Sequence, residues 1–211
     1  AALAILIVLL FLGSFRSTVI TGLTLPITLL GTLTFIWAFG FSINMMTLLA
    51  LSLSIGLLID DAIVVRENIV RHTELGKDHV TAALEGTKEI GLAVLATTLT
   101  IVAVFLPVAF MGGLIGRFFY QFGVTVSTAV LISMFISFTL DPMLSAHWKD
   151  PVEKKDNWLQ RFFNHISNVL DRLTHVYEKL LKLALRFRLI TVIVAIASLF
   201  AALGLSKLIG T

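Results

Sequence analysis

The stretch SIGLLIDDAIVVREN, residues 54–68, places two adjacent carboxylates, Asp60 and Asp61, inside an otherwise apolar run. From Ile43 to Val65 the sequence carries no other charge. A run of about 20 apolar residues is long enough to cross the hydrocarbon core of a bilayer as a helix. A charged side chain at the centre of such a helix costs about 3 kcal/mol on insertion scales. The presence of two acids at this position therefore has to be explained by their structural or functional role.

The composition of the whole chain is that of an integral membrane protein. Of 211 residues, 57% are hydrophobic and 14% are charged, whereas a soluble domain is about half apolar and about a quarter charged. The chain has no cysteine, which excludes disulfides and thiolate metal sites. Because the backbone in lipid must satisfy its own hydrogen bonds, each apolar run is predicted to be a helix. The apolar runs are residues 1–15, 18–39, 45–65, 90–111, 120–146 and 188–208.

The distribution of basic residues predicts the topology. Of the 16 Lys and Arg residues, all except Arg117 and Lys207 fall in alternate connections between the apolar runs. By the positive-inside rule these connections are cytoplasmic, including loops 66–89 and 147–188, and both chain ends face outward. The pI of about 9.4 is therefore interpreted as loop charge and not as a nucleic-acid surface. The first apolar run is short for a span, so we expect a piece of a larger protein.

Residues 156–187 differ from the apolar runs because their hydrophobic residues recur at three- and four-residue spacing. This pattern predicts a basic amphipathic helix along the cytoplasmic membrane surface, with a partner-binding helix as the alternative. The predicted fold class is thus all-α integral membrane, a bundle of about six transmembrane helices plus this surface helix. The predicted domains are 1–147 with five spans, 148–187 with the linker and surface helix, and 188–211 with the last span.

Asp60 and Asp61 lie about 100° apart around a helix axis, so both can face one interior wedge of a bundle. Neighbouring carboxylates interact strongly and are expected to titrate as a coupled pair. No Lys or Arg occurs within the apolar runs away from their ends, so a cation that pairs with them must come from a helix outside this chain. The alternative is that the pair stays neutral and hydrogen-bonded and serves packing alone.

Two faces of the same helix are predicted to support the pair. One face carries residues seven apart, which align after every two turns. Its members are Thr47, Ser54, Asp61 and Asn68. The other is an edge of small residues four apart, which permits close contact with another helix. Its members are Ser52, Gly56 and Asp60.

Other polar residues indicate less. Thr97, Thr98 and Thr100 are candidates for extending a proton path, although such hydroxyls commonly bond back to their own helix carbonyls. Asp141, six residues before His147, is expected near the cytoplasmic interface. The histidines lack ligand spacing, so no metal site is expected.

Two stretches resemble a known family. GFSINMMTLLALSLSIGLLIDDAIVVRENIVRH, residues 40–72, resembles the fourth transmembrane helix of resistance–nodulation–division (RND) multidrug exporters of the hydrophobe/amphiphile branch. FLPVAFMGGLIGRFFYQFGVTV, residues 105–126, is similar to the junction of that family's fifth and sixth helices. The resemblance covers essentially the whole chain, and the apolar runs correspond to helices two to seven.

The resemblance implies a proton/substrate antiporter of the bacterial inner membrane that exports drugs or other amphiphiles, and not an enzyme. An antiporter of this kind is expected to need no cofactor, because protons are its coupling ion. In the family, the pair matching Asp60 and Asp61 takes up and releases protons, a lysine on the tenth helix pairs with it, and an arginine on the eleventh assists. Family members are trimers that join a periplasmic adaptor and an outer-membrane channel. Both ends of this chain would then face the periplasm.

Two residues depart from the family pattern: Arg66 stands where many relatives have an apolar residue, and Asp141 where many have Thr. A relative that exports lipids or translocates protein is the alternative function. An intramembrane aspartyl protease is disfavoured, because it carries its two acids on different helices and this chain carries them on one.

Overall fold

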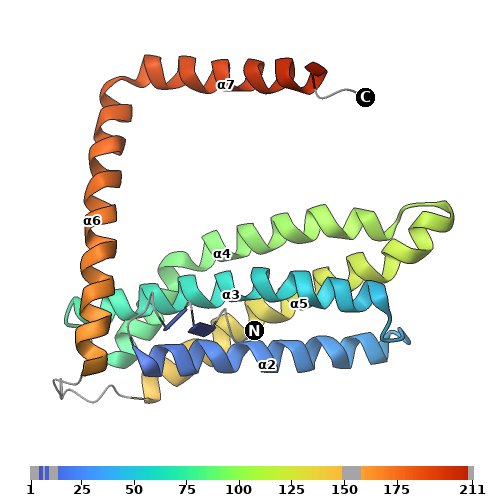
Figure 1. Ribbon diagram of the computed structural model, residues 1–211. Coiled ribbons are helices and arrows are strands. Elements are labelled where there is room, and N and C mark those ends of the chain that lie inside the picture. Colours follow the sequence, from blue (N-terminus) through green and yellow to red (C-terminus); the bar gives the residue numbers. More distant parts are fainter. Residues whose placement is uncertain (1–4, 7, 10–13, 149–157, 209–211) are drawn as a thin grey trace. The chain divides into compact units, whose positions relative to one another are not determined.

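The computed structural model describes residues 5–6, 8–9, 14–148 and 158–208 (Figure 1). All regular structure in these residues is helical, which confirms the predicted all-α membrane fold. The chain divides into two compact units, residues 1–154 and 155–211, and each is described by itself. The predicted first span, 1–15, lies largely outside the described residues.

The first unit contains four long helices that lie lengthwise beside one another in Figure 1. They are α2 (Phe15–Ala38), α3 (Met45–Glu74), α4 (His79–Ala109) and α5 (Gly113–His147). Each is long and apolar enough to cross a membrane. Helix α5 contacts the other three, and α3 contacts α2 and α4, whereas α2 and α4 do not pack on each other. The helix that carries the acid pair is therefore central in this unit.

The ends of α3 follow from capping residues and not from the end of the apolar run. Asn44 caps the helix start: its side chain accepts hydrogen bonds from the backbone of Met46 and Thr47, and its own N–H donates to the Thr47 hydroxyl at 2.9 Å. The helix ends at Glu74 and Gly76 follows with φ +87°, a conformation that favours glycine. The predicted loop 66–89 is thus mostly the ends of two helices, because hydropathy marks only the part that would lie in lipid.

The first unit packs mainly through small side chains. Helix α2 buries a row of hydroxyl residues: Ser17, Thr18, Thr21, Thr24, Thr28 and Thr32. Many large apolar side chains point outward, for example Trp37 (80% exposed) and Leu92 (79% exposed). Lipid tails are as apolar as leucine, so helices in a membrane associate through close contact of small residues. This distribution agrees with a bundle surrounded by lipid or by further helices.

Contacts across the bundle fix the direction of the helices. The Ser133 hydroxyl donates to the Leu58 carbonyl at 3.3 Å, and further along both helices Arg66 donates to the Ser145 hydroxyl, so α3 and α5 run parallel. Helix α2 is antiparallel to both, because Arg16 in its first turn donates to the Ser145 carbonyl at 3.3 Å. The basic residues at the ends of α2, α3 and α4 therefore gather at one end of the unit. Which membrane side this end faces stays a prediction.

The second unit consists of α6 (Trp158–Arg186) and α7 (Arg188–Leu208). The described parts of the two helices meet at an angle of 98° at Phe187. The hydroxyl of Thr191 donates to the carbonyl oxygens of Ala184 and Phe187 at 3.1 and 3.2 Å, and so satisfies backbone groups that the bend frees. The amphipathic segment predicted in 156–187 is confirmed as a helix. That it lies on a membrane surface stays a prediction.

Helices α4 and α5 approach each other closely at Gly123. A Cβ there would lie 2.6 Å from the Phe105 carbonyl oxygen and 3.1 Å from the Ala109 nitrogen, both backbone atoms. Gly123→Ala is therefore expected to force the helices apart and to lower the free energy of unfolding by about 1–3 kcal/mol. The measurement is thermal unfolding of the full-length protein in detergent. Gly91→Ala is the control, because a Cβ at Gly91 meets open space. Equal effects of the two substitutions would contradict this packing.

Candidate functional site

The two acids of α3 occupy different environments. The Asp61 side chain points into the first unit and is 7% exposed, and its Oδ2 has no hydrogen-bond partner among the described residues. Asp60 is exposed on the outside of the same helix. We expected both acids to face the interior of a bundle. Within the first unit only Asp61 does so.

The predicted edge of small residues lies on the open side of α3. Ser52, Gly56 and Asp60 are all exposed, and a Cβ at Gly56 would meet nothing within 4 Å. No described helix of the first unit covers this edge. It leaves room for a helix backbone to approach closely, as small residues four apart permit.

The other predicted face is buried against the neighbouring helices. Thr47 is used in the capping of α3, and the Ser54 hydroxyl donates to the Ala50 carbonyl of its own helix at 2.7 Å. Asn68 donates to the Gly86 carbonyl of α4 at 2.7 Å. The structure thus places Thr47, Ser54, Asp61 and Asn68 on one buried face, but three of the four use their polar groups in structural hydrogen bonds.

The three threonines of α4 do not form one row. Thr97 and Thr100 are exposed, and their hydroxyls donate to the Val94 and Ala96 carbonyls of their own helix at 2.9 and 2.8 Å. Thr98 is fully buried, and its hydroxyl has no partner among the described residues. Only Thr98 therefore points into the unit.

Ser137 on α5 is a further polar group of the interior. Parallel contacts of Leu58 with Ser133 and of Arg66 with Ser145 place Ser137 at about the level of Asp61. Its hydroxyl is buried and, like the Asp61 Oδ2, has no partner among the described residues. Such buried polar atoms are commonly bridged by ordered water.

Arg66 and Asp141, the two residues that depart from the family pattern, lie together in the interior. Their side chains are 2% and 0% exposed, and Arg66 Nη1 is 3.9 Å from Asp141 Oδ1. Asp141 is buried between helices in the last two turns of α5, and its expected position near the cytoplasmic interface stays a prediction. One sequence signal could have indicated this pair. Arg66 and Asp141 carry opposite charges, and both stand near the end of a span where many relatives have an uncharged residue.

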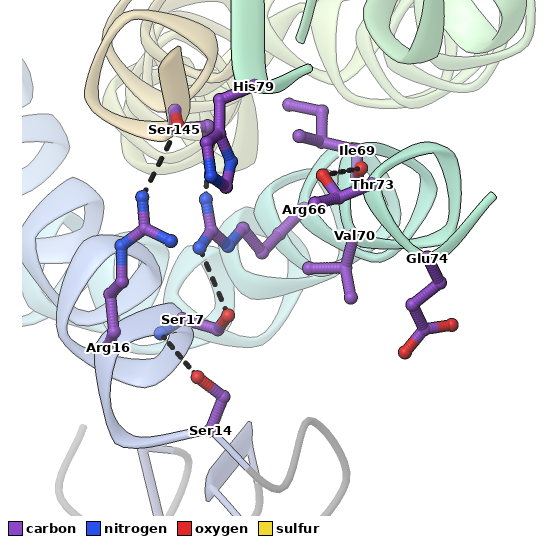
Figure 2. A pocket seen from close by; sticks show the side chains of 10 residues that line it. All are labelled: Ser14, Arg16, Ser17, Arg66, Ile69, Val70, Thr73, Glu74, His79 and Ser145. Carbon is purple, nitrogen blue, oxygen red and sulfur yellow. Dashed lines mark hydrogen bonds between the residues drawn. The ribbon is translucent and has the colours of Figure 1, made fainter. Parts of the chain in front are cut away.

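Beside this pair, α2, α3 and α5 line a cavity of about 240 Å³ (Figure 2). Figure 2 shows the guanidinium groups of Arg16 and Arg66 both directed toward Ser145. Arg66 also donates to the Ser17 hydroxyl at 3.0 Å. The side of the cavity that faces the interior of the bundle is therefore polar.

A second polar network joins α3 to the polar first turns of α4. Glu89 accepts a hydrogen bond from Arg71 at 2.7 Å and lies 2.6 Å from His72 Nε2. His72 also lies 2.9 Å from the Lys77 ammonium, which pairs with Glu85. Hydrogen bonds from His72, Arg71 and Asn68 lower the pKa of Glu89 to about 2. This network holds the last turns of α3 against the first turns of α4, next to Asn68.

Fold and site together define a class: a multi-pass α-helical membrane protein with an ionisable pair in its transmembrane region. One acid is buried among helices and the other lies on an edge open to a further helix.

Comparison with known proteins identifies the family. The AcrB/AcrD/AcrF family matches residues 1–211, and the chain belongs to this family. It is 49% identical over 150 residues (71% of this chain, 15% of the relative) to multidrug resistance protein MdtC of Pantoea ananatis. It is 40% identical over 206 residues (98% and 20%) to MdtC of Shigella flexneri. It is 42% identical over 183 residues (87% and 17%) to an uncharacterized transporter of Haemophilus influenzae.

These findings confirm the resemblance to RND multidrug exporters. With its membrane-spanning helices and this family, the chain is a multi-pass protein of the bacterial inner membrane. It spans no more than about a fifth of the length of these relatives.

The Glu89 network gives a pH-dependent prediction. Because the pKa of Glu89 is lower in the folded protein than the ordinary value of 4.5, its contribution to stability is present above about pH 4.5 and is lost as the pH falls toward about 2. Glu89→Gln should lower the Tm of the full-length protein at pH 7, and the difference from wild type should shrink between pH 5 and about 3. Glu67→Gln, at an exposed glutamate of α3, is the control. A difference independent of pH would contradict the assignment.

Proposed function

We propose that this segment is the proton-coupling part of the membrane domain of a drug-exporting antiporter. The proposal is supported by the family match over the whole chain and by the names of the relatives, which are multidrug resistance proteins. The observation that carries it is the environment of the acid pair: Asp61 is buried with an oxygen atom that no described residue hydrogen-bonds, and Asp60 lies on an open edge of the same helix. Two ionisable groups in this arrangement are a costly way to pack helices.

In the proposed cycle the two acids change their charge. When deprotonated, they attract a cation on a helix outside this chain, which the resemblance identifies as the lysine of the tenth helix. When protonated, they release it, and α3 and that helix shift relative to each other. The open edge of Ser52, Gly56 and Asp60 is where this helix approaches. Ser137 and Thr98 are buried hydroxyls that water can connect to Asp61.

The membrane potential is sufficient to drive such a change. One proton that crosses a potential of 100 mV releases about 2.3 kcal/mol, before any pH gradient is counted. A free energy of this size shifts a two-state equilibrium about fiftyfold. Substrate binding is assigned to parts of the protein outside this chain, together with assembly as a homotrimer with a periplasmic adaptor and an outer-membrane channel.

The direct test is to neutralise each acid in the full-length protein. Asp60→Asn and Asp61→Asn should each abolish drug efflux, because an amide cannot carry the proton, while the amount of protein in the membrane stays unchanged. The measurement is resistance to a panel of drugs, and accumulation of the dye ethidium, in cells that lack their other exporters. Glu67→Gln on the same helix should retain efflux. Wild-type resistance in either Asn variant would refute the proposal.

The open edge of α3 gives a second test. Gly56→Leu should reduce efflux about tenfold or more, because the side chain would occupy the space needed by the approaching helix. It should have little effect on packing within the first unit, since a Cβ there meets nothing within 4 Å. Gly91→Leu on α4 is the matched control, at a glycine that is also open. If the two variants export equally well, the edge does not contact a partner helix.

A further inference from the structure

At one end of the first unit, three helices place opposite charges in the interior. Arg66 of α3 is 2% exposed and Asp141 of α5 is 0% exposed, and Arg16 of α2 lies beside them (Figure 2). The proton-coupling mechanism proposed above assigns no role to these residues. A charge buried among helices is stable only where other groups of the protein compensate it.

The contacts join the helices through one serine. Arg66 Nη1 lies 3.9 Å from Asp141 Oδ1 and donates to the Ser145 hydroxyl, which in turn lies 2.6 Å from the Asp141 carbonyl oxygen and 3.3 Å from Oδ1. Arg66 Nη2 donates to the Ser17 hydroxyl of α2 at 3.0 Å. The guanidinium thus ties α3 to both α5 and α2 at this level.

We propose that Arg66 and Asp141 act as one unit, a buried ion pair that positions α3 against α5 and cancels the field that Arg66 alone would impose on Asp60 and Asp61. The proposal rests on the proton-coupling function proposed above. Arg66 and Asp141 are positioning residues in this scheme, because they act on the proton-carrying pair without exchanging protons themselves.

The size of the field follows from helix geometry. Arg66 follows Asp61 by about one and a half helical turns, which separates their backbones by about 7.5 Å along the axis. At about 10 Å and an effective dielectric constant of about 20, a unit charge changes a protonation equilibrium about tenfold. Asp141 next to Arg66 turns this charge into a short dipole, whose field is much weaker.

Few other charges lie on the helices around α3. In the described residues α2 carries only Arg16, and α5 carries only Arg117, Asp141 and His147. The acids of α4, Glu85 and Glu89, are paired with Lys77, Arg71 and His72 at the polar junction. Of the other titratable residues of α4, Lys88 is exposed, and His79 lines the cavity beside Arg66 (Figure 2). Within α3 itself, Glu67 is exposed. The charge balance nearest to the acid pair within this unit is therefore set by Arg66, Asp141 and Arg16.

The first measurement tests whether the two charges depend on each other. In the full-length protein, Asp141→Asn and Arg66→Met should each shift the folding equilibrium by about a hundredfold or more, because each removes one charge of the buried pair and leaves the other in the interior. The double variant Arg66→Met/Asp141→Asn should fold better than either single variant. If the single variants fail to fold, recovery in the double variant still supports the pair. A double variant no better than the worse single one overturns it.

The second measurement tests the effect on the acid pair. The infrared carboxyl C=O band of the reconstituted protein is followed against pH, and the part lost in Asp60→Asn and Asp61→Asn is assigned to those residues. In Asp141→Asn the midpoint of this band should move toward lower pH by about one unit, because a guanidinium without the Asp141 carboxylate beside it favours ionised Asp60 and Asp61. In the double variant it should return close to the wild-type value, and Glu67→Gln should leave it unchanged. A pair that only stabilises the fold would not move it.

The outcomes separate the two proposals. If no carboxyl band that depends on Asp60 or Asp61 changes with pH in the wild type, the proton-coupling function fails. If the band titrates in the wild type but keeps its midpoint in Asp141→Asn, the function stands and the role of Arg66 and Asp141 is overturned.

Discussion

Charge inside a membrane bundle must be compensated by the protein, because lipid offers no hydration. The first unit of this chain meets this constraint in two ways. Arg66 and Asp141 compensate each other between α3 and α5. Asp61 and Asp60 have no cation in the apolar part of the helices of the first unit, and Asp60 lies on an edge that no described helix of this unit covers. One site is therefore complete within the described helices, whereas the proposed function takes the cation of the other site from a helix outside this chain.

The same constraint explains the surfaces between the helices. Since apolar contact with another helix offers no advantage over contact with lipid, close packing of small residues holds the bundle together. The buried hydroxyl row of α2 and the glycines of α4 and α5 provide this close contact, while leucine and aromatic side chains point outward. A polar interior of this kind also provides a buried hydroxyl group at about the level of Asp61, that of Ser137, at little cost in packing.

Hydropathy and charge distribution predicted the all-α membrane fold, and helical geometry predicted the buried face that contains Asp61. Hydropathy underestimated the length of α3. The apolar run ends near Val65, whereas the helix continues to Glu74 and is followed by Gly76 with its positive φ. The ion pair of Arg66 and Asp141 was missed, since the register between two helices far apart in sequence is fixed by tertiary packing. Helical geometry also could not show which acid faces the interior, because that depends on which neighbouring helices are present.

The hydroxyl row of α2 has a mechanical consequence. Thr24, Thr28 and Thr32 donate to carbonyls of their own helix. In the described residues, the side-chain hydrogen bonds between α2 and other helices occur only in its first turn, at Arg16 and Ser17. Beyond that turn, α2 meets its neighbours through van der Waals contacts that have no fixed direction. A change in the tilt of α2 about its first turn would therefore break none of the side-chain hydrogen bonds that join it to other helices.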